Sequence, residues 1–193
     1  MSMTDDQLAG LYISGSPEAF DVLLERYKDK VYSYIRFIVR NADVADDIFQ
    51  ETFVKAIMTL QRGAYTGSGK FGAWLIRIAH NLIMDGFRQE RSATVISNDA
   101  SEVDLFNNAE LSDMNVEDRM INSQVLEDVR RLVMMLPDNQ REVVFMRYYQ
   151  NMSFKDIADV TGVSINTALG RMRYALINIR HMAEENRMVL TLA

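Results

Sequence analysis

One stretch of the chain, residues 93–118, constrains the fold more than any other feature of the sequence. It contains seven Asp and Glu residues, no Lys or Arg, and no regular spacing of apolar residues. Such a segment cannot bury enough apolar surface to pack, and its carboxylates repel one another. The stretch therefore predicts a flexible, extended linker between two lobes. The alternative is a solvated loop with no further role.

The flanking lobes, residues 1–92 and 119–193, are both predicted to be helical. Their apolar residues recur at spacings of three and four, and only two of the 193 residues are proline. Pro17 follows Ser16, a residue type that caps helices, and Pro137 separates two periodic stretches. Helices are expected at residues 4–14, 17–39, 43–61, 70–91, 118–136, 138–149, 153–160 and 164–186. The predicted fold class is all-α, with two small helical domains joined by a flexible acidic linker.

Composition excludes several classes of protein. The chain has no cysteine, which rules out disulfides and thiolate zinc sites, and its two histidines make a histidine-rich metal site implausible. No apolar run approaches the roughly 20 residues that span a bilayer, and the polar, acidic start is unlike a signal peptide. We therefore expect a cytoplasmic, soluble protein without a cofactor or membrane insertion.

The net charge of −6 is concentrated in the linker. Residues 1–92 carry 11 basic and 12 acidic side chains, and residues 119–193 carry 10 and 8. A glycine-rich string at residues 63–71 (GAYTGSGKF) superficially resembles a phosphate-binding loop. That motif needs Gly where Ala64 stands and Ser or Thr where Phe71 stands, so we interpret the string as a mobile loop that a ligand can approach closely.

The strongest motif lies at residues 153–176 (SFKDIADVTGVSINTALGRMRYAL). Ser153 and Ser164 are suited to cap two successive helices, and Ala158 is small where those helices would cross. Gly162 permits the left-handed backbone that a tight turn between them needs. The segment therefore predicts a helix-turn-helix.

The second helix of this motif has one apolar and one basic, polar face. Ala168, Met172, Ala175 and Ile179 share the apolar face. The opposite face and its flank carry Asn166, Thr167, Gly170, Arg171, Arg173 and Tyr174. No acidic residue occurs between Gly162 and Ala183, which favours an approach to the DNA major groove. The alternative is a helical hairpin with a solvated basic face.

A second basic stripe is predicted on the helix at residues 70–91. Its buried stripe is expected to hold Phe71, Leu75, Ile78 and Leu82, and the neighbouring stripe holds Arg77, Asn81, Met84 and Arg88. Trp74 lies between the stripes, and Tyr65 is in the preceding loop. Aromatic rings beside cations suit single-stranded nucleic acid, although Trp74 as an ordinary core residue is equally compatible. Asp85 is placed near the buried side, where a structural salt bridge is expected.

The helix at residues 43–61 shows a face suited to a protein partner. Ala45, Ile48, Phe49, Thr52, Phe53, Ala56 and Leu60 are expected to pack inward. The opposite face carries Asp43, Asp47, Gln50, Glu51, Val54 and Met58. Acidic groups repel DNA, and exposed apolar groups beside them favour a protein with basic residues. A solvated acidic face is the alternative, and a carboxylate metal site lacks a histidine at ligand spacing.

Together these motifs resemble the sigma factors of bacterial RNA polymerase, in particular the small extracytoplasmic-function (ECF) group. The resemblance rests on residues 43–53 (DVADDIFQETF), residues 71–85 (FGAWLIRIAHNLIMD) and residues 136–176, in that order. It implies a specificity subunit without catalysis of its own, which binds core polymerase and directs promoter recognition, local melting and transcription initiation. It also implies a possible anti-sigma partner.

The resemblance implies a role for each set of residues. Residues 1–92 would bind polymerase and the minus-10 element, and residues 119–193 would read the minus-35 element as duplex. Polymerase contacts, including a coiled coil of the largest subunit, would fall to Asp43, Asp47, Gln50, Glu51, Val54 and Met58. The single-stranded minus-10 element, with one everted base, would fall to Tyr65, Lys70, Phe71, Trp74, Arg77, Asn81, Met84, Arg88 and Arg91. The minus-35 element would fall to Ser164, Asn166, Thr167, Gly170, Arg171, Arg173 and Tyr174.

The chain departs from the family pattern at two places. Where many relatives carry Val, then Lys or Arg, then Ser on the reading helix, this chain has Ala168, Leu169 and Gly170, which shifts the expected base contacts to Arg171, Arg173 and Tyr174. The basic cluster that ends the minus-10 helix is thinned to residues 88–91 (RQER), so the salt dependence of DNA binding should be shallow.

Two further hypotheses remain for the sequence. A stand-alone regulator would share the helix-turn-helix but would form a symmetric dimer on a palindrome, and it does not explain the stripe from Arg77 to Arg88. A helical enzyme lacks any paired acid–base constellation or phosphate loop.

Overall fold

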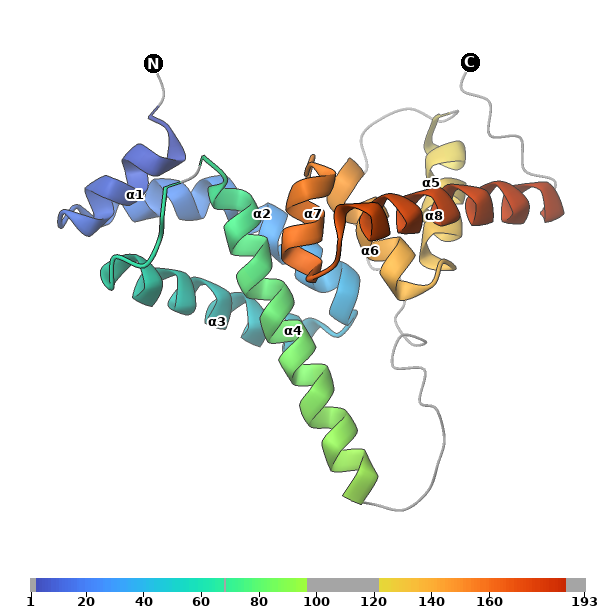
Figure 1. Cartoon of the computed structure of the whole chain (residues 1–193), viewed down its shortest axis with the longest axis horizontal. Helices are drawn as coiled ribbons and strands as arrows, with labels where there is room; N and C mark the ends of the chain where they lie inside the picture. The colour runs from blue at the N-terminus through green and yellow to red at the C-terminus, as the bar shows by residue number, and fades with distance from the viewer. Residues whose placement is uncertain (1–2, 68, 97–121, 187–193) are drawn as a thin grey trace. The chain divides into compact units, whose positions relative to one another are not determined.

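The computed structural model describes residues 3–67, 69–96 and 122–186, all of them in helices and short connections (Figure 1). The chain divides into two compact units, Met1–Ala109 and Glu110–Ala193. The first unit contains α1 (Asp5–Ile13), α2 (Pro17–Val39), α3 (Ala42–Gln61) and α4 (Phe71–Ile96). The second contains α5 (Asn122–Met134), α6 (Asp138–Tyr148), α7 (Phe154–Thr161) and α8 (Ile165–Glu185). The predicted all-α, two-domain fold is confirmed for the described residues.

In the first unit α2 is the central helix. It contacts α1, α3 and α4, and its Leu23, Val31, Tyr34 and Ile35 are almost completely buried. The facing side of α3 contributes Ala45, Thr52, Phe53, Ala56 and Leu60 to the core, while Ile48 and Phe49 are half-buried. Because one face of each helix packs here, the opposite faces of α3 and α4 remain available for partners.

The helix starts follow the sequence with one exception. Thr4 forms a capping box with Gln7 at the start of α1, and the Asn41 side chain accepts from the backbone amide of Val44 at the start of α3. Ser16 occupies the cap position before Pro17, but its hydroxyl donates to Glu18 at 2.9 Å and caps no backbone amide. The predicted side-chain cap at Ser16 is therefore wrong.

The buried side of α4 differs from the predicted stripe. Phe71, Leu75 and Leu82 are buried as predicted, but Ile78 is only half-buried. Buried positions also include Ile76, Ala79, His80 and Ile83. The helix contacts both α2 and α3, so its apolar contact face is wider than a single stripe.

Two further expectations for α4 are corrected. Asp85 is exposed, and its salt bridge is a surface pair in which Arg88 Nη1 lies 2.8 Å from Asp85 Oδ1. The helix continues to Ile96, so the first residues of the predicted linker are helical, and the last turns extend beyond the other helices of the unit (Figure 1). The rest of the predicted linker, up to residue 118, lies outside the described residues.

In the second unit α8 contacts α5, α6 and α7. Ala168, Met172, Ala175 and Ala183 on α8 are buried, whereas Ile179 is only half-buried. Arg141 of α6 is also buried, and its guanidinium donates to the Met134 carbonyl and pairs with Asp138. The ion pair within α6 offsets part of the cost of burying this charge, and the bond to Met134 joins α6 to the end of α5.

The predicted helix-turn-helix is present. Ser153 forms a capping box with Asp156 at the start of α7, and Gly162 ends that helix with φ 68° in the left-handed region. The Ser164 side chain then accepts from the backbone amide of Thr167 at 3.0 Å and so caps α8. The sequence predicted all three features because each depends on local backbone chemistry.

Candidate nucleic-acid and protein interfaces

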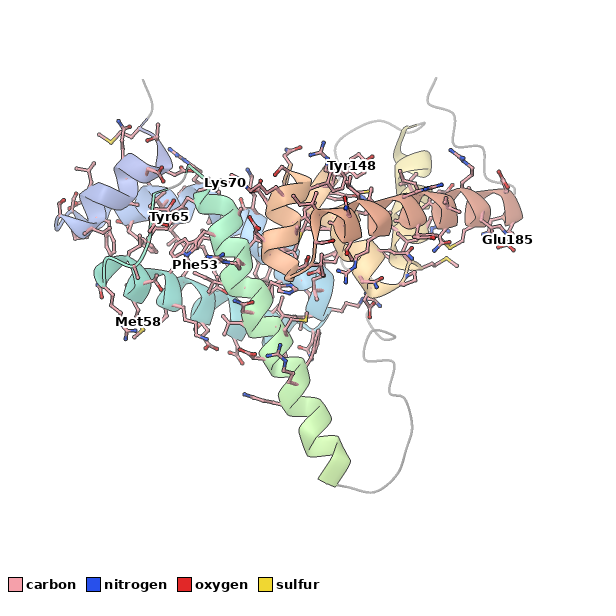
Figure 2. All side chains as sticks on the ribbon, viewed as in Figure 1. Phe53, Met58, Tyr65, Lys70, Tyr148 and Glu185 are labelled. Carbon is pink, nitrogen blue, oxygen red and sulfur yellow. The ribbon has the colours of Figure 1, made fainter. Side chains whose placement is uncertain are left out.

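The glycine-rich connection between α3 and α4 is fastened to α1 by Asp6. The Tyr65 hydroxyl donates to Asp6 Oδ1 at 2.8 Å, and the backbone amide of Gly69 donates to Asp6 Oδ2 at 2.8 Å. A Cβ atom on Gly67 would lie 3.2 Å from the same carboxylate, so the chain passes it very closely. The loop was predicted to be mobile, but the Asp6 carboxylate holds it at Tyr65 and at Gly69. Figure 2 shows Tyr65 on this connection, close to the start of α4.

The neighbouring carboxylate, Asp5, performs a similar task toward α2. It accepts hydrogen bonds from the Arg26 guanidinium and the Tyr27 hydroxyl. Burial, followed by the hydrogen bond to Asp5, raises the pKa of the Tyr27 hydroxyl above its ordinary value, so this group stays a donor. Sequence reasoning missed both aspartates, because an acidic pair in a first helical turn is usual on electrostatic grounds alone.

An aromatic cluster packs at the base of the loop, around the start of α4. Ring centroids lie 4.8 Å apart for Tyr65 and Trp74, 5.2 Å for Phe71 and Trp74, and 5.6 Å for Tyr27 and Phe71. Phe71 is only 1% exposed, as predicted for the buried stripe. Its ring packs against the half-buried rings of Tyr65 and Trp74 and holds them in place, and its role at the minus-10 element stays a prediction.

Asp6→Ala is expected to release the loop without unfolding the unit. Two hydrogen bonds to a half-buried carboxylate disappear, which should cost about 1–2 kcal/mol. Trp74 is the only tryptophan of the chain and touches Tyr65, so its fluorescence should shift and the Gly69 amide should exchange faster with solvent. Asp21→Ala, a change at an exposed acid of α2, should leave both readouts unchanged. Equal exchange at Gly69 in the wild type and Asp6→Ala would contradict the anchoring role.

The predicted stripe on α4 faces solvent. Arg77, Asn81 and Arg88 are exposed and Met84 is half-buried, as is Trp74 beside them. One residue before Asn81, the buried His80 lies with its Nδ1 3.1 Å from the Tyr34 hydroxyl of α2. His80 lies with Ala79 and Ile83 on the packed side of α4, and the cationic residues lie on the exposed side. Lys70, just before α4, is also exposed, and Arg91 lies outside the described side chains.

The predicted protein-facing surface of α3 is fully formed. All six of its residues are exposed: Asp43, Asp47, Gln50, Glu51, Val54 and Met58. Val54 is 52% and Met58 44% exposed, which is high for apolar side chains on a helix with a buried opposite face. Figure 2 shows Met58 projecting from α3, away from the other helices of its unit. Lys55 Nζ lies 3.1 Å from Glu51 Oε1, so one acid is already partly neutralised.

The exposed face of α8 keeps most of its predicted members. Ser164, Asn166, Thr167, Arg173 and Tyr174 are exposed, whereas Gly170 and Arg171 are half-buried. The Ser164 and Thr167 hydroxyls lie 2.8 Å apart and are engaged with each other at the helix start. Sequence reasoning did not place Ile165 and Leu169 on this surface, yet they are 46% and 43% exposed. Helical periodicity identifies the buried apolar residues of α8 and gives no signal for these two exposed apolar side chains.

The described residues offer neither a metal site nor a membrane span. No group of three or more His, Asp or Glu side chains among them could hold a metal ion. No helix in that part of the chain is long and apolar enough to cross a membrane.

Family models match both units. Residues 23–93 match Sigma-70 region 2, and residues 126–173 match Sigma-70 region 4. The first match covers α3 and most of α2 and α4, and the second covers α6, α7 and the first part of α8, up to Arg173. The matches therefore contain the exposed residues described above on α3 and α4, and all of those named on α8 except Tyr174.

Individual relatives agree with the family models. The ECF RNA polymerase sigma-E factor of Escherichia coli is 30% identical over 88% of this chain and 89% of its own length. The ECF sigma factor BldN of Streptomyces coelicolor is 34% identical over 77% of the chain, which spans only 54% of that longer relative. The sigma factor RpoE of Bartonella quintana, solved with the anti-sigma factor NepR, shares the fold with a TM-score of 0.64 and 19% identity, over 86% of this chain and 96% of that one. The chain belongs to the ECF sigma factors of bacterial RNA polymerase.

Proposed function

We propose that this sigma factor binds its partners through three exposed surfaces. The acidic and apolar side of α3 binds core polymerase, the α4 stripe binds the minus-10 strand, and α8 binds the minus-35 duplex. The observation that carries the proposal is the charge of these surfaces. The α4 and α8 surfaces are basic, whereas the α3 surface is acidic with two exposed apolar groups. The phosphates of nucleic acid are attracted to the basic surfaces of α4 and α8 and repelled by the acidic surface of α3.

The α4 stripe is suited to hold a single strand. Arg77 and Arg88 can bind phosphates, and the Asn81 amide can donate to and accept from a base edge. The loop beside them is fastened by Asp6, which presents the half-buried rings of Tyr65 and Trp74 in a fixed position. A preformed surface lowers the cost of ordering the strand and helps offset the unstacking of an everted base, which is a few kcal/mol.

Reconstitution with core polymerase tests the proposal as a whole. The full chain should co-purify with core polymerase, and sequencing of transcript starts should show two upstream elements common to the initiated promoters. A stand-alone regulator would instead bind a palindrome as a dimer, without polymerase. A chain that neither binds polymerase nor redirects initiation would overturn the proposed function.

A double substitution in α4 tests the strand-binding surface. Arg77→Ala together with Asn81→Ala should reduce promoter opening by at least about tenfold, since one phosphate contact and one base contact are lost. Permanganate reactivity of unpaired thymines measures the opening. The matched control is Gln89→Ala, an exposed polar change on the same helix but off the stripe, which should open the promoter normally. Normal opening by the double variant would remove this surface from the proposal.

Regulation by an anti-sigma protein is a further part of the proposed function. The Bartonella quintana relative was solved in complex with such a factor, and this chain has the same fold. We expect a tagged chain, expressed in its own host, to retain an anti-sigma protein that competes with core polymerase. Binding of both at once to one chain would contradict this expectation.

A further inference from the structure

We propose that Leu169, with Ile165 beside it, reads the 5-methyl groups of thymine in the upstream duplex element. This inference rests on the proposed function of α8 and adds a specificity-determining contact to it. The starting observation is that Ile165 is 46% and Leu169 43% exposed in the first turns of α8, beside the exposed polar residues Asn166 and Thr167. A helix of this type enters the major groove with its first turns against the base edges.

The position of Leu169 places it among the polar residues proposed to touch DNA. At 100° per residue it lies within about 60° of both Asn166 and Arg173 on the helix surface. All three are exposed. Leu169 lies at the edge of the face that holds Asn166 and Arg173, about 40° beyond Arg173, so it would lie against the groove when those two residues reach bases or phosphates. A strongly hydrated surface there would leave the leucine unfavourably exposed, whereas a methyl group would cover it.

The hydroxyl groups at the helix start are already in use. Ser164 accepts from the Thr167 amide at 3.0 Å, and its hydroxyl lies 2.8 Å from that of Thr167. Both side chains are therefore committed to capping α8, which reduces what they can offer to a base. The remaining groups on this turn are the Asn166 amide and the two apolar side chains. Among base edges in the major groove, thymine carries the methyl group that such apolar side chains can recognise.

The test uses the assembled holoenzyme and the upstream element identified by transcript-start mapping. Each thymine in that element is replaced in turn by deoxyuridine, which removes the methyl group and keeps the hydrogen-bonding edge. With the wild-type chain, one or two of these replacements should weaken promoter binding about fourfold, the value expected for one buried methyl group. With Leu169→Ala, binding to the original element should be similarly weaker, and the same replacements should then have no effect.

Leu176→Ala provides the matched control. Leu176 is an equally exposed leucine, 47%, on the same helix but about two turns further along. That variant should retain the full sensitivity to deoxyuridine. Thermal unfolding should be unchanged in both variants, because both side chains are exposed.

Several results would overturn the inference. They are an upstream element without thymine, wild-type binding indifferent to every replacement, or a Leu169→Ala variant that stays sensitive. A Leu169→Ala variant that lost affinity for core polymerase instead would assign this apolar edge to a protein contact and would equally overturn it. Failure of the wild-type holoenzyme to bind any promoter duplex is a distinct result, because it removes the proposed function itself.

Discussion

Val54→Asp combined with Met58→Asp should weaken the binding of core polymerase about 100-fold or more. The two side chains form the exposed apolar part of the α3 surface, 52% and 44% exposed, amid carboxylates. Two further acids at these positions would be desolvated without partners in any interface that buries them, and central contacts of this kind commonly carry about 2 kcal/mol or more each. Titration of labelled core polymerase with the full chain measures the effect.

A matched pair of substitutions guards against a general charge effect. Leu11→Asp with Val22→Asp adds the same two charges at apolar positions of similar exposure, 40% and 46%, on α1 and α2. This control should bind polymerase with nearly wild-type affinity. Equal losses in both double variants would mean that overall charge, and not the α3 surface, governs the association.

Gly72→Ala should destabilise the first unit by about 1–3 kcal/mol, as overpacked sites do. A Cβ atom at this position would lie 2.6 Å from Cε1 of Tyr27. The tyrosine ring cannot move aside easily, because its hydroxyl donates to Asp5 and its ring packs on Phe71 with centroids 5.6 Å apart. Urea unfolding followed by the fluorescence of Trp74 reports on this unit, since it contains the only tryptophan.

The same helix supplies a control for helix propensity. A Cβ atom at Gly86 would point into open space, with no packed neighbour within 4 Å, so Gly86→Ala should stabilise α4 by about 0.5–1 kcal/mol. A loss of stability in Gly72→Ala together with a gain in Gly86→Ala would separate steric crowding from helix propensity. If Gly72→Ala were as stable as Gly86→Ala, the close packing of Tyr27 on α4 would be refuted.

Local chemistry explains which parts of this fold could be predicted from the sequence. The turn at Gly162 and the caps at Ser153 and Ser164 were predicted correctly, because each depends on residues within three or four positions. The outward faces of α3 and α4 followed from helical periodicity, since one side of each helix packs against α2. Their roles in polymerase and DNA binding stay predictions.

Contacts between distant residues account for what sequence reasoning missed. Asp6 accepts a hydrogen bond from the backbone amide of Gly69, which lies 63 positions further along the chain. No local pattern distinguishes Asp6 from an ordinary acid in a first helical turn. Ile78 was placed in a core stripe by spacing alone, but α4 packs against two helices, and the side chains that fill that contact are Ile76 and Ile83.

The two adjacent aspartates of α1 have a practical consequence for anyone shortening or tagging this protein. Asp5 and Asp6 connect the first helical turn to Arg26, Tyr27, Tyr65 and Gly69. Removal of the first six residues would therefore act far along the chain, on the segment proposed to capture a base. A trimmed protein that still binds polymerase but opens promoters poorly would owe that defect to its missing N-terminal fastening.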